Sequence, residues 1–260
     1  MSDSDEPGIS RTYSIARRLL QIRLAASFLT ILPIGPGALA SPEDQAAAFG
    51  WFPLVGFALG LVLCAEDRIL AGLFAPLLRS SLIVMTLAIV TGALHLDGLA
   101  DTADALGARA DHERALAILR DSHIGTFGSV ALIFVIGLKI AALANAHGWQ
   151  RYAAMYAAPG LARWAMTGIG YGLEYLREQG AGIPLLKRGA ARSLRVATII
   201  AVIAMVPLLG RCAVRAALTA VVITLGLRGF YRRWLGGITG DLIGAAGEMV
   251  ETAVLIALAS

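Results

Sequence analysis

A run of acidic residues between Leu94 and Gly128 is the part of this sequence best suited to chemistry. Asp97, Asp101 and Asp104 are spaced at i, i+4 and i+7, which places their carboxylates along one face of a helix. Three adjacent negative charges repel one another unless a cation lies among them. A hard divalent cation bound by carboxylate oxygens, most simply Mg²⁺ shared with a phosphate-bearing substrate, is the expected solution.

A second polar segment opens the last apolar run of the chain. Asp241 and Glu248 are seven residues apart on one helical face, and Glu251 follows one turn later. Acids within a membrane-spanning helix are unfavourable in lipid, so we expect them to face the interior of a helix bundle. Gly237 precedes the predicted helix start, where it would let backbone approach a ligand, whereas Gly244 fits close helix packing equally well.

Two cations, Lys139 and Arg163, lie within apolar runs. Counting a helical rise of about 1.5 Å per residue from the inner face places both at the depth of Glu248, near mid-membrane. We therefore predict one buried ionic group. Two interpretations remain open: a structural salt bridge, or cations that neutralise substrate phosphate.

The turn around His123 joins the acidic run to the next apolar run. With Gly125 and Thr126 it could present backbone N–H groups to an anion, or it could be an ordinary capped helix entry. Arg120 adjoins the turn, and we expect it to bind phosphate. His95, just before the first aspartate, could act as a base or ligand, or could only hydrogen-bond at a helix end.

Composition indicates where these residues lie. The chain has 260 residues, of which 15% are charged, and its mean hydropathy is +0.72. We predict an all-α, polytopic transmembrane helical bundle of about six to seven spans, with a disordered N-terminus over residues 1–10 and a single membrane domain over 11–260. The predicted spans are 46–65, 77–94, 129–146, 152–173, 194–209, 214–227 and 238–258.

Two parts of this prediction have alternatives. The basic and apolar stretch before residue 34 could be a signal peptide cleaved near Ala40, but prolines and glycines interrupt it, which favours a short interfacial or re-entrant helix. The fifth and sixth spans are shorter than the roughly 20 residues of a crossing, so their flanking arginines snorkel or the pair forms a shallow hairpin.

Basic residues set the orientation. With the N-terminus inside, the outer segments hold only five, which are Arg68, Arg79, Arg151, Arg211 and Arg215. The inner segments hold fifteen, which are Arg11, Arg17, Arg18, Arg23, Arg109, Arg114, Arg120, Arg177, Lys187, Arg188, Arg192, Arg195, Arg228, Arg232 and Arg233. This bias places the acidic run on the cytoplasmic side.

Acidic stripes on two helices, glycines and buried cations together suit phosphoryl transfer from a pyrophosphate-linked donor. The aspartate spacing that begins at Asp97 is loosely similar to the membrane CDP-alcohol phosphotransferases, although the A-R and second D-x-x-x-D of that class are absent. An ion-coupled transporter would also place charges within helices. It would not need so many acids in one stripe on the cytoplasmic side.

Longer motifs carry a closer resemblance. HLDGLADTADALGAR, LRDSHIGTFG and GGITGDLIGAAGEMVE, with SFLTILPIG and WFPLVG before them, resemble the cobalamin synthase family, the adenosylcobinamide-GDP ribazoletransferases. The resemblance covers most of the chain. The sequence departs from the family pattern at Ala105, where glycine is more usual, and at His123, where arginine is common. Neither departure replaces an acidic residue.

The resemblance implies the final step of cobalamin biosynthesis, in which α-ribazole or its 5′-phosphate joins the phosphate retained by adenosylcobinamide and GMP leaves. It implies Mg²⁺ as cofactor, and the Mg²⁺ ligands carried over by motif are Asp97, Asp101, Asp104 and Asp241. Besides Asp101, the catalytic candidates are two general bases, Asp121 or His95. The residues expected to bind substrate or its phosphates are Arg120, His123, Gly125, Thr126, Lys139, Arg163 and Gly237.

The expected partners follow from this interpretation. They are the substrates adenosylcobinamide-GDP and α-ribazole, and the lipids of the inner membrane, with the site open to the cytoplasm and no role for nucleic acid. A homo-oligomer, and transient contact with other enzymes of the pathway, are both compatible with it.

Overall fold

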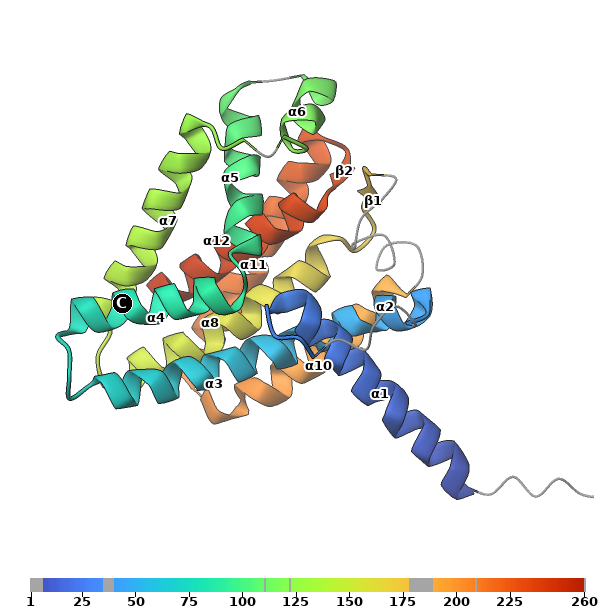
Figure 1. Cartoon of the computed structure of the whole chain (residues 1–260), viewed down its shortest axis with the longest axis horizontal. Coiled ribbons are helices and arrows are strands. Elements are labelled where there is room, and N and C mark those ends of the chain that lie inside the picture. Colours follow the sequence, from blue (N-terminus) through green and yellow to red (C-terminus); the bar gives the residue numbers. More distant parts are fainter. Residues whose placement is uncertain are drawn as a thin grey trace, which may run out of the picture.

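The computed structural model describes residues 7–34, 40–109, 111–121, 123–177, 189–208 and 210–259, with side chains from residue 15 onward. Most of this part of the chain is helical, which confirms the predicted helical fold (Figure 1). In chain order the elements are α1 (Pro7–Leu29), α2 (Pro42–Ala48), η2 (Phe49–Trp51), α3 (Phe52–Leu70), α4 (Pro76–Val90), α5 (Leu94–Gly107), α6 (His112–Ile118), α7 (Thr126–Asn145), α8 (Gly148–Ile169), β1 (Glu174–Tyr175), α10 (Ala190–Met205), η3 (Val206–Leu208), α11 (Arg211–Trp234), β2 (Gly237–Ile238) and α12 (Gly240–Ala259).

Within the described residues, five helical stretches are long and apolar enough to cross a membrane. α4 and α5 pass the same test as a pair, but the chain bends by 91° between them. This pattern agrees with the predicted polytopic membrane protein. The five stretches are Pro42–Leu70, Thr126–Asn145, Ala190–Leu208, Arg211–Trp234 and Gly240–Ala259.

The sixth predicted span is longer than hydropathy alone indicated. α11 has 24 residues, which corresponds to a length of about 36 Å and is enough to cross a bilayer. The prediction of a short span was wrong because α11 carries Arg211 and Arg215 at one end and Arg232 and Arg233 at the other. The long arginine side chains reach water from the helix ends, so no shallow hairpin is needed.

α8 forms the centre of the bundle. It packs against α3 and α12 (Figure 1). Most of its side chains are buried. A Cβ on Gly56 of α3 would lie 2.3 Å from the Pro159 carbonyl oxygen of α8, so the two backbones are as close as a glycine permits. Because α8 faces other helices, it needs little lipid-facing surface. Accordingly, α8, predicted as the span 152–173, is not among the stretches that are long and apolar enough to cross a membrane.

Two short strands join the end of α8 to the beginning of α12. β1 and β2 pair in parallel, with Glu174 opposite Gly237. A Cβ on Gly237 would lie 2.5 Å from the Glu174 carbonyl oxygen, so the close approach that this glycine permits is to β1. The all-α prediction did not include this pair, because two-residue strands are too short to show a periodicity.

α1 belongs to the bundle at one end only. Ala25 and Leu29 are fully buried, whereas Ile15 and Leu19 are more than half exposed. In Figure 1 the helix (dark blue) extends away from the other elements. Exposed arginines beside exposed aliphatic residues are typical of an interfacial helix. The alternative cleavage site falls mainly on residues 35–39, outside the described residues.

Candidate active site

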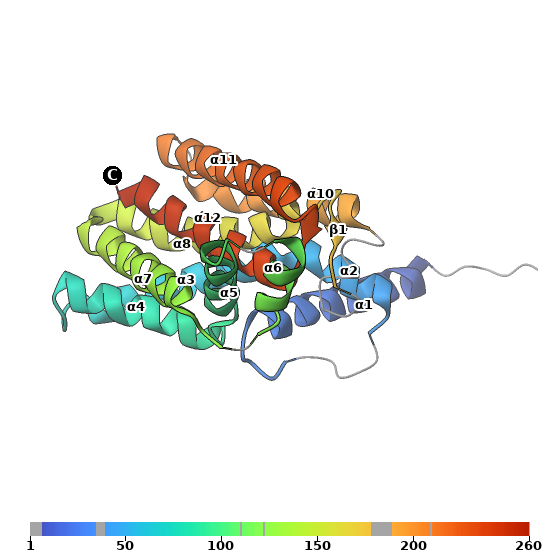
Figure 2. The same cartoon turned by 90° about the horizontal axis from the view of Figure 1, so that it is seen from above.

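The direction of α5 is set by a sharp bend after α4. Gly92 and Ala93 both have left-handed backbone conformations, with φ of 60° and 53°. A residue with a side chain, such as Ala93, is disfavoured there by about 1–2 kcal/mol, so the packing around the bend must hold it. As a result α5 stands steeply against α4 and packs beside α7 and α12 (Figures 1 and 2).

The predicted stripe of carboxylates is present on α5. Asp97 is exposed, and Asp101 and Asp104 are half-buried. The start of α12 lies against this helix because Gly98 leaves room for it: a Cβ on Gly98 would be 2.7 Å from the Asp241 carbonyl oxygen. The negative charges of Asp97, Asp104 and Asp241 therefore act on the carboxylate of Asp101. The other three residues predicted as metal ligands thus lie within electrostatic range of Asp101.

Asp104 has a second role in the structure. Its carboxylate accepts hydrogen bonds from the backbone N–H groups of Gly125, at 2.7 Å, and Gly128, at 2.9 Å. These groups belong to the first turn of α7, whose positive end favours an anion. A Cβ on Gly125 would lie 2.3 Å from Asp104 Oδ1. The turn that the sequence offered to an anion thus binds a carboxylate of the chain itself.

Asp241 is held by a cation that the sequence analysis had counted only as a basic residue. Its Oδ2 accepts a hydrogen bond from the guanidinium of Arg177 and another, at 3.2 Å, from the Thr239 hydroxyl. The same nitrogen of Arg177 also donates to the Leu119 carbonyl oxygen at the end of α6. Arg177 also lies within electrostatic range of Asp101. Among the described residues it is the one cation that forms an ion pair with a carboxylate of the site.

Asp121 and His123 form an exposed pair beside the site. Nδ1 of His123 lies 2.5 Å from Oδ1 of Asp121, and their side chains are 88% and 56% exposed, respectively. The hydrogen bond to His123 holds the pKa of Asp121 below its usual range, and the same bond raises the pKa of His123. Arg120 and Thr126 are also exposed nearby in sequence.

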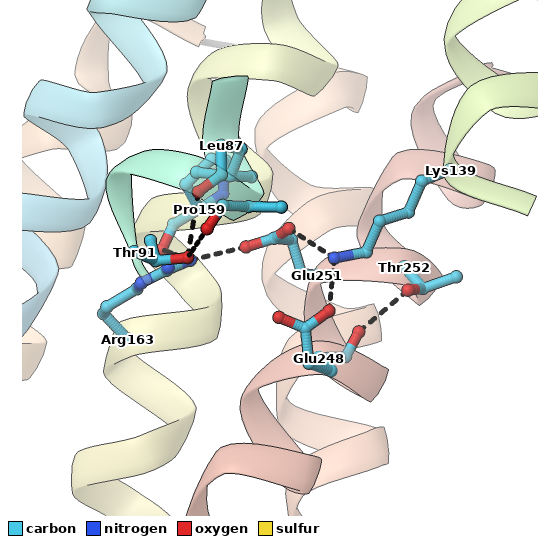
Figure 3. Close-up of polar contacts among 9 residues, drawn as sticks. Leu87, Thr91, Lys139, Pro159, Arg163, Glu248, Glu251 and Thr252 are labelled. Carbon is cyan, nitrogen blue, oxygen red and sulfur yellow. Dashed lines mark hydrogen bonds and ion pairs between the residues drawn. The ribbon is translucent and has the colours of Figure 1, made fainter. Parts of the chain in front are cut away.

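The predicted buried ionic group is confirmed, with Glu251 as its central member. Lys139 Nζ lies 2.5 Å from Glu248 and 2.6 Å from Glu251, and Arg163 lies 2.5 Å from the other oxygen of Glu251. Figure 3 shows these side chains pointing toward one another from α7, α8 and α12. None is more than 7% exposed. Because both cations are already paired, the geometry favours the structural interpretation.

His95 lies between this ionic group and the carboxylate stripe. It is 3% exposed, and its Nε2 has no hydrogen-bond partner among the described residues. Arg163, Lys139 and Glu251 are close enough to act on its charge. A Cβ on Gly244 of α12 would lie 3.3 Å from the Cα of His95, so the two helices are close at this point. The histidine is therefore a buried contact between α5 and α12.

The donor chemistry of the stripe suits a hard cation. Asp97 and Asp101 make no side-chain hydrogen bond or ion pair with any residue that the structure describes. Their oxygens are the ligands that Mg²⁺ prefers. In the described ranges, however, no three carboxylate, histidine or cysteine side chains already converge as metal ligands. Asp104 and Asp241 are engaged with the α7 turn and with Arg177, respectively.

Residues 21–259 match the family model described as cobalamin-5-phosphate synthase. The chain belongs to this family. The resemblance found in the motifs is thereby confirmed, and the matched range contains every site residue described above.

Members of the cobalamin-5-phosphate synthase family are similar to this chain over almost its whole length. The adenosylcobinamide-GDP ribazoletransferase of Pseudomonas syringae pv. syringae is 39% identical over 93% of this chain and 99% of its own. Proteins of the same name from Syntrophobacter fumaroxidans and Geotalea daltonii are 38% and 36% identical, each over 90% of this chain and 96% and 95% of their own, respectively. No solved structure matches the chain.

A second buried ionic group in this family member was missed by the sequence analysis. Arg151 of α8 lies 2.6 Å from Asp67 of α3, and Arg79 of α4 lies 3.0 Å from the same oxygen. Arg151 also donates to the Ser80 hydroxyl at 3.1 Å. The signal was available, because Asp67 is an acid at the end of an apolar run. The same argument that identified Glu248 applies to it.

Proposed function

We propose that this chain catalyses the adenosylcobinamide-GDP ribazoletransferase reaction. The observation that carries the proposal is the similarity, over nine-tenths of the chain, to three enzymes of that name. The cluster of Asp97, Asp101, Asp104 and Asp241 supports it, because a diphosphate-linked donor needs cations to balance its charge and carboxylates to hold them.

In the proposed reaction a hydroxyl oxygen of α-ribazole, or of its 5′-phosphate, attacks the phosphorus next to cobinamide. A new oxygen–phosphorus bond forms, the bond from that phosphorus to the bridging oxygen of the diphosphate breaks, and GMP leaves. The proton of the attacking hydroxyl passes to a base. Positioning and charge stabilisation account for most of the catalysis in such transfers.

We infer that Asp97 and Asp101 are the first ligands of a Mg²⁺ ion, because their carboxylates have no other partner in the described structure. Bound there, Mg²⁺ would polarise the phosphate oxygens and stabilise the charge that builds up on the leaving group. Asp104 keeps lone pairs free while it caps α7. Asp241 joins the site when its ion pair with Arg177 opens, and Arg177 then binds a substrate phosphate.

The base in this proposal is supplied by the Asp121–His123 pair. Both side chains are exposed and so accessible to a substrate from solution. The alternative base, His95, is only 3% exposed and faces the buried ionic group. We therefore assign His95 to the positioning of α5. The bias of basic residues toward the segments beside the site supports a site that faces the cytoplasm.

Turnover by detergent-purified protein tests the proposal. The substrates are adenosylcobinamide-GDP and α-ribazole, with and without Mg²⁺, and the measured products are GMP and adenosylcobalamin. We expect Mg²⁺-dependent turnover, reduced at least about 100-fold in Asp101→Asn, as when a group that stabilises transition-state charge is removed. Glu113→Gln removes an exposed acid from the neighbouring α6 and should retain activity.

The outcomes separate the parts of the proposal. Turnover that is equal with and without Mg²⁺ would reject the metal but keep the reaction. An Asp101→Asn variant with full activity would remove the stripe from the mechanism. No product from folded protein would reject the reaction itself, and CDP-linked donors and then vesicle uptake assays would follow.

A further inference from the structure

A cavity of about 650 Å³ lies between α1, α2, η2 and α10. None of its lining residues belongs to α5, α6, α7 or α12, so it is separate from the carboxylate site. In both Figure 1 and Figure 2, α1 and α2 lie on the opposite side of the molecule from α7. The reaction proposed above uses none of the residues that line this cavity.

The polar part of the cavity is strongly basic. Arg17, Arg18 and Arg192 line it, with Glu43 as the acidic lining residue. Neither Arg18 nor Arg192 forms an ion pair or a side-chain hydrogen bond with a residue that the structure describes. Two guanidinium groups that line one cavity and have no partner among the described residues favour an anionic ligand, and phosphate oxygens match their geometry.

A buried carboxylate holds this wall in place. Asp44 is 7% exposed and accepts hydrogen bonds from Arg17 Nε at 2.7 Å and from Gln21 Nε2 at 2.9 Å. Gln21 in turn accepts a hydrogen bond from the Trp51 indole N–H at 3.2 Å. The contacts link α1, α2 and η2, so Arg17 and Arg18 of α1 project from a fixed framework.

The rest of the wall is apolar and follows a membrane-spanning helix. Val196, Ile199 and Ile200 line the cavity from α10, which lies within the apolar stretch Ala190–Leu208. Ile199 is 58% exposed. From Arg192 to Ile200 the helix rises about 12 Å, which exceeds the thickness of one headgroup region, so a headgroup at the basic end leaves the apolar end for an acyl chain.

We propose that this cavity binds an anionic phospholipid, with its phosphate between Arg18 and Arg192 and an acyl chain along Ile199 and Ile200. A soluble phosphate compound would match the arginines but leave the apolar wall uncovered. The exposed Ile15 and Leu19 of α1, on either side of Arg17 and Arg18, extend the same combination of basic and aliphatic surface.

Calorimetry on the detergent-purified protein tests the proposal. The two ligands are the anionic dioctanoyl phosphatidylglycerol and the zwitterionic dioctanoyl phosphatidylcholine. We expect the anionic lipid to bind at least about 10-fold more tightly, and the variant R18Q/R192Q to lose at least about 10-fold of that affinity. The control R195Q/R232Q removes two exposed arginines that do not line the cavity. It should bind within about twofold of the wild type.

Further ligands identify the source of the phosphate. Glycerophosphoglycerol has the same headgroup without acyl chains, and inorganic phosphate lacks both. If either binds the wild type as tightly as the lipid, the site takes soluble phosphates and the proposal is wrong. Equal affinity for the two lipids, or equal losses in R18Q/R192Q and the control, would also overturn it. The comparison of ligands on wild-type protein does not depend on the folding of any variant.

Discussion

Two groups of carboxylates in this chain differ in how their charge is balanced. At the junction of α5 and α12, Asp97, Asp101, Asp104 and Asp241 have Arg177 as their one ion-pair partner among the described residues. Two turns farther along α12, Glu248 and Glu251 are matched by two cations of α7 and α8. The first group has an excess of negative charge, and the second is neutral as a whole.

The difference follows from burial. An unpaired charge in the interior destabilises a protein by several kcal/mol, so acids at the depth of Glu248 need cationic partners. Asp97 is exposed, and its charge is stabilised by solvent. The paired group is suited to holding helices together, and the unpaired group to binding. α12 contributes to both, so the buried pairs also fix the position of Asp241.

Neutralising the central acid of the paired group should have the largest effect. Glu251→Gln leaves Arg163 without its carboxylate and Lys139 with one partner instead of two. We expect the free energy of unfolding to fall by about 3–5 kcal/mol, the usual loss when a buried pair is broken. Thermal unfolding in detergent measures it, with Glu248→Gln as the milder comparison. An unchanged midpoint would show that the group does not hold the helices.

The sequence predicted those contacts that regular helices determine. The spacing of Asp97, Asp101 and Asp104 placed them on one face because helical periodicity is local. Counting the rise per residue brought Lys139 and Glu248 to one depth, although they are 109 residues apart. Both arguments need only straight helices and a membrane as a common reference.

Contacts made through bends and loops were not predictable in this way. Arg177 reaches Asp241 across 64 residues from a segment without periodicity. The left-handed conformation of Ala93 at the bend has no sequence signal, because alanine does not favour a positive φ. Asp104 was expected only as a metal ligand. Its contact with the α7 turn was not predictable, because it depends on that bend. The partners of the site residues were therefore harder to predict than the residues themselves.

The packing that joins the two groups can be tested at Gly98. In Gly98→Ala the new Cβ would lie 2.7 Å from the Asp241 carbonyl oxygen, so α5 and α12 must separate. We expect a loss of about 1–3 kcal/mol in the free energy of unfolding, measured by thermal denaturation, together with reduced turnover. Gly137→Ala on α7 is the matched control, because its Cβ would meet nothing within 4 Å. Equal stability of the two variants would contradict the close contact.

Neutralising an acid of the group with excess negative charge should change the free energy of unfolding in the opposite direction from Glu251→Gln. Asp101→Asn removes repulsion with Asp97 and Asp104, which are one helical turn away on either side. We expect the free energy of unfolding without metal to rise by about 0.5–1 kcal/mol, the scale of like-charge repulsion on a helix. Thermal unfolding in the presence of a chelator measures it. A clear loss of stability would mean that Asp101 is structurally paired and would remove the contrast between the groups.

The exposed pair beside the site gives the smallest and most specific effect. If His123 is the base, it must be neutral to accept a proton, so turnover should rise as the pH increases through the pKa of His123. The hydrogen bond to Asp121 raises that pKa. Asp121→Asn removes that charge and lowers the pKa of His123, so the rising limb of kcat/KM should move to lower pH. His123→Asn should abolish the limb. A limb that stays in place in Asp121→Asn would assign the proton transfer to a group outside this pair, and His95, on the boundary between the two carboxylate groups, would be the next to test.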